Sequence, residues 1–285
     1  MADTTDLNRG PKFRPKKRLG QHFLKDPGMI HKLITLAGFD RSHRILEIGP
    51  GLGALTFPLA GSVQHLVAVE KDARVAEILR RRLTRAGVDN VTLVQGDILK
   101  VDFREMAIPF EKGMHLIGNL PFNISSPLLE KLINNRSLLV KAVLTFQLEL
   151  ARRLVASPGN KEYGAITVLI QYHARLRPLM EIPKEAFHPR PKVGSMVLEM
   201  DFTRPYPRKA SDEGNFRRVV RAAFAHRRKT VVNSLRGALP SLSAGKILEA
   251  LEACRIEPGV RAEVLGIDDF LCLSDSLPFL DNSSA

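Results

Sequence analysis

Residues 119–122, Asn-Leu-Pro-Phe, carry groups that could hold a flat ring bearing an amine. They follow residues 114–117, an apolar run that is typical of a buried strand. The side-chain oxygen of Asn119 and the carbonyl of Leu120 can accept the two hydrogens of an exocyclic amine. Pro121 restricts the backbone, and the ring of Phe122 can stack on a base. The tetrapeptide therefore predicts a catalytic, base-binding loop at the end of a strand.

A glycine-rich turn at residues 49–53, Gly-Pro-Gly-Leu-Gly, predicts a second site. Glycine lets the chain turn sharply and approach a ligand closely, which makes Gly49 and Gly51 candidate ligand contacts. Dinucleotide-binding turns prefer Gly-x-Gly-x-x-Gly, whereas here the third glycine comes one residue earlier. Glu47, inside the preceding strand, also fits a methyl-donor site better than a nicotinamide site.

Two acids stand where the next two predicted strands end. Glu70 could bind a ribose diol, and Asp97 could meet an adenine amine. Each has a structural alternative, a solvent-facing acid for Glu70 and a helix N-cap for Asp97. Because ligands collect at the carboxyl ends of parallel strands, the glycine turn and both acids together predict S-adenosylmethionine binding.

These residues are placed by an alternation of strands and helices. Such alternation predicts an α/β fold, with a parallel sheet covered by helices on both faces, as in Rossmann-like methyltransferases. The predicted strands are 44–48, 65–69, 91–94, 114–117, 139–146 and 195–202. The predicted helices are 30–37, one beginning at 54–60, 73–86, 127–133, one ending near 155, and 164–173.

The pattern changes after Asp201, where a Pro-rich stretch, 203–208, predicts a linker. Beyond it the pattern indicates helices only, at 215–225, 230–239, 246–253 and 268–280. We therefore predict three parts. They are a basic flexible arm at 1–20, a methyltransferase domain at 21–205 and a smaller, all-helical RNA-binding domain at 206–285.

Composition indicates the kind of partner. Lys and Arg number 43 against 30 acids, a net charge of +13 over 285 residues, which favours a polyanion such as nucleic acid over a merely soluble basic protein. No apolar run approaches the length of a membrane span. Cys254 and Cys272 form no CxxC pair, so we expect neither a disulfide framework nor a structural zinc, and a reducing cytosol fits.

Taken together, these motifs resemble the ribosomal RNA adenine N6,N6-dimethyltransferases of the KsgA/RsmA type. Three further segments are similar to elements of that family, namely 19–24 (Leu-Gly-Gln-His-Phe-Leu), 187–195 and 224–235. There are departures, since His22 stands where many members have Asn, Phe122 where bacterial members often have Tyr, and Gly194 in place of a usual Asp.

The resemblance implies N6,N6-dimethylation of two adjacent adenines in the 3′-terminal hairpin loop of 16S rRNA, with a role in ribosome biogenesis. It implies S-adenosylmethionine as methyl donor, no metal, no membrane, a monomer and a cytoplasmic location. Phe122 would stack on the base, with Phe187 as candidate for the other face, although core packing is the alternative for both. The implied donor contacts are His22, Leu24, Gly49, Gly51, Glu70, Asp97 and Asn119. The candidate RNA contacts are Arg221, Arg227, Arg228 and Lys229.

Two alternatives remain open from the sequence. A macrolide-resistance type of methyltransferase modifies large-subunit rRNA with a similar catalytic domain, although the Arg-Arg-Lys-Thr segment and the C-terminal tail favour the small-subunit type. A non-catalytic ribosome assembly factor could retain the fold, but the intact donor and Asn-Leu-Pro-Phe motifs weigh against it.

Overall fold

The computed structural model describes residues 20–108, 110 and 113–278. The predicted basic arm therefore lies outside the described residues, except for Gly20. Among the described helices, none is long and apolar enough to cross a membrane.

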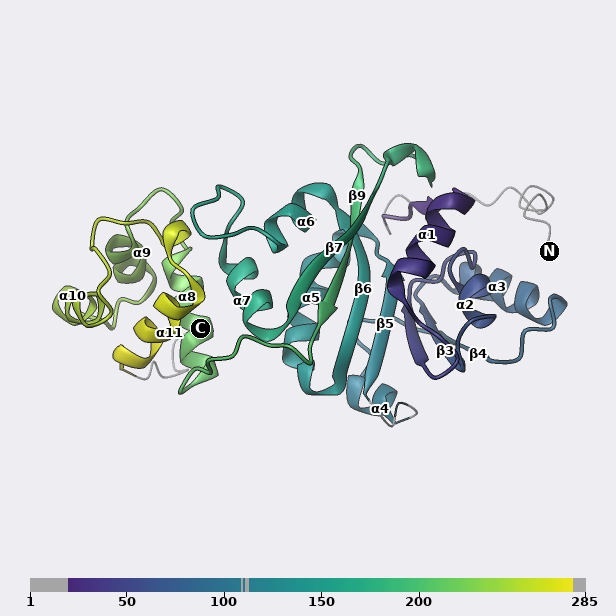
Figure 1. The fold of residues 1–285 in the computed structure, drawn as a ribbon, viewed down its shortest axis with the longest axis horizontal. Helices are drawn as coiled ribbons and strands as arrows, with labels where there is room; N and C mark the ends of the chain where they lie inside the picture. Colours follow the sequence, from purple (N-terminus) through teal and green to yellow (C-terminus); the bar gives the residue numbers. More distant parts are fainter. Residues whose placement is uncertain (1–19, 109, 111–112, 279–285) are drawn as a thin grey trace.

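A seven-stranded sheet in the order β4-β3-β2-β5-β6-β9-β7 forms the centre of the molecule (Figure 1). The first five strands run parallel, but β9 lies antiparallel between β6 and β7, so the predicted all-parallel sheet is wrong at this end. The strands are β2 (Arg44–Ile48), β3 (His65–Glu70), β4 (Val91–Gln95), β5 (Met114–Asn119), β6 (Leu139–Gln147), β7 (Arg175–Ile182) and β9 (Ser195–Asp201). The helices of this part are α1 (Pro27–Ala37), α2 (Thr56–Ala60), α3 (Ala73–Arg85), α4 (Phe103–Ala107), α5 (Ser125–Asn134), α6 (Leu148–Leu154) and α7 (Ala165–His173).

Strand β7 was absent from the sequence-based prediction. It is an edge strand, with exposed charged side chains and Pro178 at a shift of register against β9. Proline and charge are typical of sheet edges, because an edge strand leaves part of its backbone unpaired. These residues hide the alternation that marks a half-buried strand.

The alternation of side chains along the strands builds two cores, one on each face of the sheet. Neighbouring residues such as Ile45 and Leu46 belong to different clusters. One cluster contains residues of α1 and α2, and the other contains residues of α5, α6 and α7. The larger cluster continues without a break into the C-terminal helices through Phe216 and Val219. Helices thus cover both faces of the sheet, as predicted.

Beyond Asp201 the described residues form helices, as the sequence predicts. They are α8 (Glu213–Ala223), α9 (Val231–Ala238), α10 (Ala244–Ala253), a short 3-10 turn at Ala262–Val264, and α11 (Ile267–Ser276). These helices gather at one end of the molecule, beside α7 (Figure 1). The boundary near residue 205 stays a prediction, because the hydrophobic core is shared across it.

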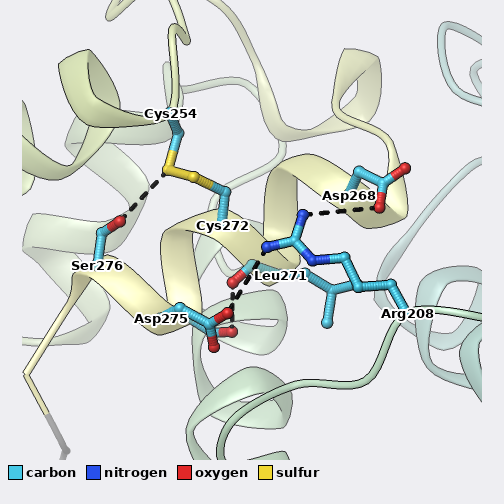
Figure 2. The surroundings of a disulfide bond; sticks show 8 residues. Arg208, Cys254, Asp268, Leu271, Cys272, Asp275 and Ser276 are labelled. Atoms are coloured by element: carbon cyan, nitrogen blue, oxygen red, sulfur yellow. Dashed lines mark hydrogen bonds and ion pairs between the residues drawn. A yellow bond between two sulfur atoms is a disulfide. The ribbon is translucent and has the colours of Figure 1, made fainter.

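A disulfide joins Cys254 to Cys272, which corrects the expectation that these cysteines stay unpaired (Figure 2). Cys254 caps the end of α10, and Cys272 lies within α11. Packing of these helices brings the two Cα atoms to 5.7 Å, within the range that a disulfide requires. A separation of 18 residues in sequence carried no sign of this proximity.

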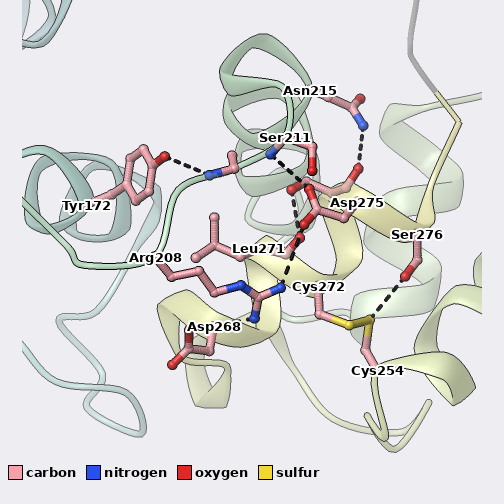
Figure 3. A network of polar contacts seen from close by, with 12 residues as sticks. Tyr172, Arg208, Ser211, Asn215, Cys254, Asp268, Leu271, Cys272, Asp275 and Ser276 are labelled. Carbon is pink, nitrogen blue, oxygen red and sulfur yellow. Dashed lines mark hydrogen bonds and ion pairs between the residues drawn. A yellow bond between two sulfur atoms is a disulfide. The ribbon is translucent and has the colours of Figure 1, made fainter.

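The linker before α8 is held by polar contacts with α7 and α11 (Figure 3). The Tyr172 hydroxyl accepts the N–H of Ala210 at 2.9 Å, and the Asp275 carboxylate accepts the N–H of Ser211 at 3.2 Å. Arg208 reaches Asp268 and Asp275 at 3.8 and 3.7 Å. The helical part is therefore fastened to the sheet part at the residues that join them.

Candidate active site

The parallel register brings the candidate residues to one edge of the sheet. Ile48 at the end of β2 is paired with Val69 of β3 and with Gly118 of β5. Gly49, Glu70 and Asn119 come directly after these paired residues. Because β2 has β3 on one side and β5 on the other, the strand order reverses at this point, where ligands bind in open α/β sheets.

The glycine turn adopts a backbone that other residues rarely take. The φ angles of Gly49, Gly51 and Gly53 are +69°, +57° and +91°. A Cβ atom added to Gly51 would lie 2.9 Å from the Phe23 ring, and one added to Gly53 would lie 2.8 Å from Leu79. The turn therefore needs glycine both for its conformation and for its close packing. Gly51 and Gly53 are buried and Gly49 is partly exposed, and we call this turn the glycine cradle.

Glu70 supports the glycine turn from the end of β3. Its carboxylate accepts the N–H of Gly51 at 3.1 Å and that of Asp72 at 2.8 Å. The residue is 7% exposed, and this burial raises its pKa above the ordinary value. A carboxylate has about four acceptor positions, so Glu70 can bind these two donors and still accept hydroxyl groups of a ribose.

Glu47 lies beneath the same turn, wholly buried in β2. The Thr56 hydroxyl donates a hydrogen bond to it at 2.8 Å. Burial raises the pKa of Glu47 to about 8, against a smaller opposing effect of the Thr56 bond. Sequence reasoning singled out Glu47 but gave no partner for it, and Thr56 carried no signal.

Asp97 follows β4 and lies partly buried. Burial alone would raise its pKa, but the hydrogen bonds from Lys71 and from the Leu99 N–H outweigh it, so the pKa lies below the ordinary value. Lys71 Nζ is 2.7 Å from one carboxylate oxygen, and Leu99 N is 3.1 Å from the other. The bond from Leu99 stabilises a turn and caps no helix, since the next helix, α4, is capped by Asp102, so the N-cap alternative for Asp97 is wrong. The bond does not exclude a ligand contact. Lys71 was missed from the sequence.

A second, two-stranded sheet brings the N-terminal segment to the site. In it β1 (Phe23–Leu24) pairs with β8 (Phe187–His188). The Leu24 side chain is buried, so only its backbone could contact a donor. Phe187 is 2% exposed and packs in the core with Leu24 and Ile117. Its predicted stacking role is therefore not supported, and the packing alternative describes it correctly.

Asn119 is the last residue of β5. Its Nδ2 donates to the carbonyl of His22 at 3.0 Å. Because a carbonyl can only accept, this bond fixes the amide orientation and leaves Oδ1 as an acceptor. A Cβ added to Gly49 would lie 3.9 Å from Pro121 Cδ, so the tetrapeptide and the glycine turn are adjacent. The half-buried ring of Phe122 stacks on the His22 ring, with centroids 5.4 Å apart.

The side chains at this edge are suited to a nucleoside-bearing ligand. The carboxylates of Glu70 and Asp97, which can accept hydroxyl and amine groups, lie at the edge beside the glycine cradle. Asn119 lies on the other side of the cradle, at the end of β5. Among the described residues, no three His, Cys, Asp or Glu side chains gather closely enough to hold a metal ion.

The predicted RNA contacts fall into two groups. Arg221, on α8, pairs with Glu130 of α5 at 2.7 Å, and the Arg227 guanidinium donates to the carbonyl of Lys161. Arg228 and Lys229 are exposed in the turn between α8 and α9. Because α8 ends at Ala223, Arg221 and Arg228 do not lie on one continuous helix. Arg221 and Arg227 therefore make contacts within the protein, whereas Arg228 and Lys229 remain exposed.

Comparison with known proteins identifies the family. The family described as "Ribosomal RNA adenine dimethylase" matches residues 12–277. The chain belongs to this family. It is 43% identical over 262 residues to "Ribosomal RNA small subunit methyltransferase A" of Desulforapulum autotrophicum, covering 92% of each chain. It is 42% identical to the protein of that name from Geobacter metallireducens, covering 94% of this chain and 98% of the relative.

Solved structures confirm the fold of this dimethylase-family chain. A dimethyladenosine transferase from Plasmodium falciparum is 27% identical, with a TM-score of 0.74, covering 88% of this chain and 95% of the other. The 23S rRNA methyltransferase ErmE is 23% identical, with a TM-score of 0.67 over 90% of this chain and 99% of its own, and shows the fold alone. The predicted Rossmann-like methyltransferase fold and the rRNA adenine methyltransferase class are thus confirmed.

Proposed function

We propose that this enzyme uses S-adenosylmethionine to dimethylate N6 of two adjacent adenines in the 3′-terminal hairpin loop of small-subunit rRNA. The observation that carries the proposal is the bond from Asn119 Nδ2 to the His22 carbonyl. This bond fixes the amide so that Asn119 Oδ1 is free to accept a hydrogen of an adenine amine. The glycine cradle lies beside it. The small-subunit name of relatives at 42–43% identity supports the choice of RNA.

The donor would be held by the backbone of the glycine turn, with Glu70 on the ribose, Asp97 on the adenine, and contacts from His22, the Leu24 backbone and Asn119. When bound, S-adenosylmethionine supplies an electrophilic methyl group on a sulfonium. The ionised carboxylate of Glu70 would give this edge a negative charge that suits a cationic donor, whereas Glu47, whose pKa burial raises to about 8, adds little charge at neutral pH.

The acceptor side depends on orientation rather than on a strong base. The adenine amine is a poor nucleophile because its lone pair is delocalised into the ring. Asn119 Oδ1 and the Leu120 carbonyl would accept its hydrogens and favour a more pyramidal nitrogen, so that positioning and fixed dipoles supply most of the rate. Pro121 fixes the direction of the preceding carbonyl. Phe122 would stack on the base after the RNA loop presents it.

RNA binding would rest on the exposed positive charges, chiefly Arg228 and Lys229, which position the RNA backbone rather than specify its sequence. Arg221 and Arg227 could join them only by giving up their contacts within the protein. A cytoplasmic monomer that acts during ribosome biogenesis is part of the same proposal.

The test is methyl transfer from labelled S-adenosylmethionine to isolated small subunits that lack the modification, followed by mass-spectrometric mapping. Dimethyladenosine in the terminal hairpin is the expected product. Transfer to large-subunit RNA alone would keep the chemistry but assign the resistance-type substrate. Donor binding without transfer to either subunit would favour the non-catalytic assembly factor.

A further inference from the structure

His22 connects three parts of the active site. Its Nδ1 lies 2.7 Å from the carbonyl of Pro189, its own carbonyl accepts the Asn119 amide, and its ring stacks on Phe122. Because a carbonyl can only accept, Nδ1 carries the hydrogen of the first bond, which fixes the plane of the imidazole. The ring is therefore a fixed surface and not a freely rotating side chain.

The geometry of the two rings is an offset stack. The centroids are 5.4 Å apart and the planes differ by 29°, within the arrangement that aromatic pairs prefer. Phe122 begins the short 3-10 turn Phe122–Ile124, directly after Pro121, and its side chain is only half-buried. Without a neighbour on one side, such a ring could turn about its side-chain bonds and would stack less well on a base.

We propose that His22 is a positioning residue for the acceptor base, which acts by backing the Phe122 ring. The imidazole covers one face of Phe122 and leaves the other face to the adenine. This role differs from a donor contact, and it depends on an aromatic ring at position 22. It also explains how one aromatic residue serves the base while Phe187 stays in the core.

The proposal rests on the proposed function, and a double-mutant cycle tests it. The variants are His22→Asn, Phe122→Leu and the double variant, with the kcat/KM for small subunits as readout. His22→Asn should lower kcat/KM about three- to tenfold in the wild-type background, the range expected for one aromatic contact. In the Phe122→Leu background the same change should have less than about a twofold effect, because the ring that His22 supports is gone.

Two comparisons separate this role from others. His22→Phe keeps a ring but loses the bond to Pro189, so it should lose less activity than His22→Asn. The Kd for S-adenosylhomocysteine, measured by calorimetry, should rise by a smaller factor than kcat/KM falls in His22→Asn, because Asn keeps a hydrogen-bonding side chain for the proposed donor contact. Independent, multiplicative losses in the cycle, or a fall in donor affinity that matches the fall in kcat/KM, would overturn the proposal.

Failure of the proposed function would be visible in the wild-type enzyme before any variant is compared. If the wild type modifies large-subunit RNA instead, the same cycle run on that RNA still tests His22. If it transfers no methyl group, the cycle is measured on the Kd for an unmodified rRNA hairpin, where equal losses in both backgrounds would again contradict the proposal.

Discussion

At the carboxyl edge of the sheet, the candidate site is assembled from polar atoms and from glycine backbone with positive φ. Three glycines with positive φ form the turn, the buried acids Glu47 and Glu70 support it, and Asn119 joins segments that are 97 residues apart. At the junction between the sheet and helices α8–α11, by contrast, apolar packing continues across the boundary and is reinforced at the surface.

The junction also has an aromatic pair and a surface ion pair, but they serve a different purpose. Tyr172 packs on Phe216 with ring centroids 4.5 Å apart, and the pair of Arg221 with Glu130 lies at the surface. Each contact there adds to a core that already exists. At the candidate site each contact orients one side chain or backbone group, and no neighbouring contact can replace a contact that is lost. Substitutions at the junction should therefore change stability, whereas those at the edge should change chemistry.

The largest stability effect should come from the disulfide in the helical part. Cys254→Ser removes a cross-link over 18 residues of sequence and should lower the free energy of unfolding by ~3 kcal/mol under oxidising conditions. Urea unfolding with and without dithiothreitol measures it. The reductant should destabilise the wild type and leave the variant unchanged, while donor affinity stays the same in both. A loss of donor binding in the variant would contradict the separation of the two regions.

Asn119→Ala should show the opposite pattern. Loss of the Oδ1 acceptor should lower kcat about 100-fold, as for removal of one positioned hydrogen-bonding group in other active sites. Donor affinity should fall by a smaller factor, because the glycine turn and Glu70 remain. Asn160→Ala is the matched control, since that side chain makes only a local bond to the Glu162 N–H. A kcat within threefold of the wild type for Asn119→Ala would sink the proposed mechanism.

Gly51→Ala should weaken the donor site by a smaller amount. The left-handed conformation costs a non-glycine residue roughly 1–2 kcal/mol, and the new methyl group would press on Phe23. We expect the Kd for S-adenosylhomocysteine to rise about tenfold. A strain of roughly 1–2 kcal/mol in the conformation that binds the donor corresponds to about that loss of affinity. Gly87→Ala is the control, because Gly87 has a φ of +63° but nothing within 4 Å of an added Cβ. Equal losses of donor affinity in both variants would point to general strain instead of the cradle.

The sequence predicted where the candidate residues lie on the strands better than it predicted how distant segments pack. The glycine turn, Glu70 and Asn119 were placed correctly, because strand ends and glycine turns are local features. The predictions failed where the outcome depended on packing between distant segments. The stacking role of Phe187, the unpaired cysteines and the parallel course of the last strands all belong to this class. Spacing along the chain carries no record of such contacts.

The free energy of unfolding should depend on pH in opposite directions for a buried group in each of the two regions. Burial holds the pKa of Glu47, beneath the glycine turn, at about 8 against an ordinary 4.5, so the folded state keeps the proton longer. Its contribution to stability is present below pH 4.5 and is lost as the pH rises towards 8. His173 faces the helical part, and burial, with smaller effects of Arg136 and Arg217, lowers its pKa to about 3 from 6.5.

The contribution of His173 therefore has the opposite sign. It is present above pH 6.5 and is lost as the pH falls towards 3. Each group changes the free energy of unfolding by at most about 1.4 kcal/mol per pH unit. Glu47→Gln should flatten the alkaline side of a curve of urea unfolding against pH, and His173→Gln the acid side. If either variant flattened both sides, the two regions would share one titrating network, and the contrast between them would fail.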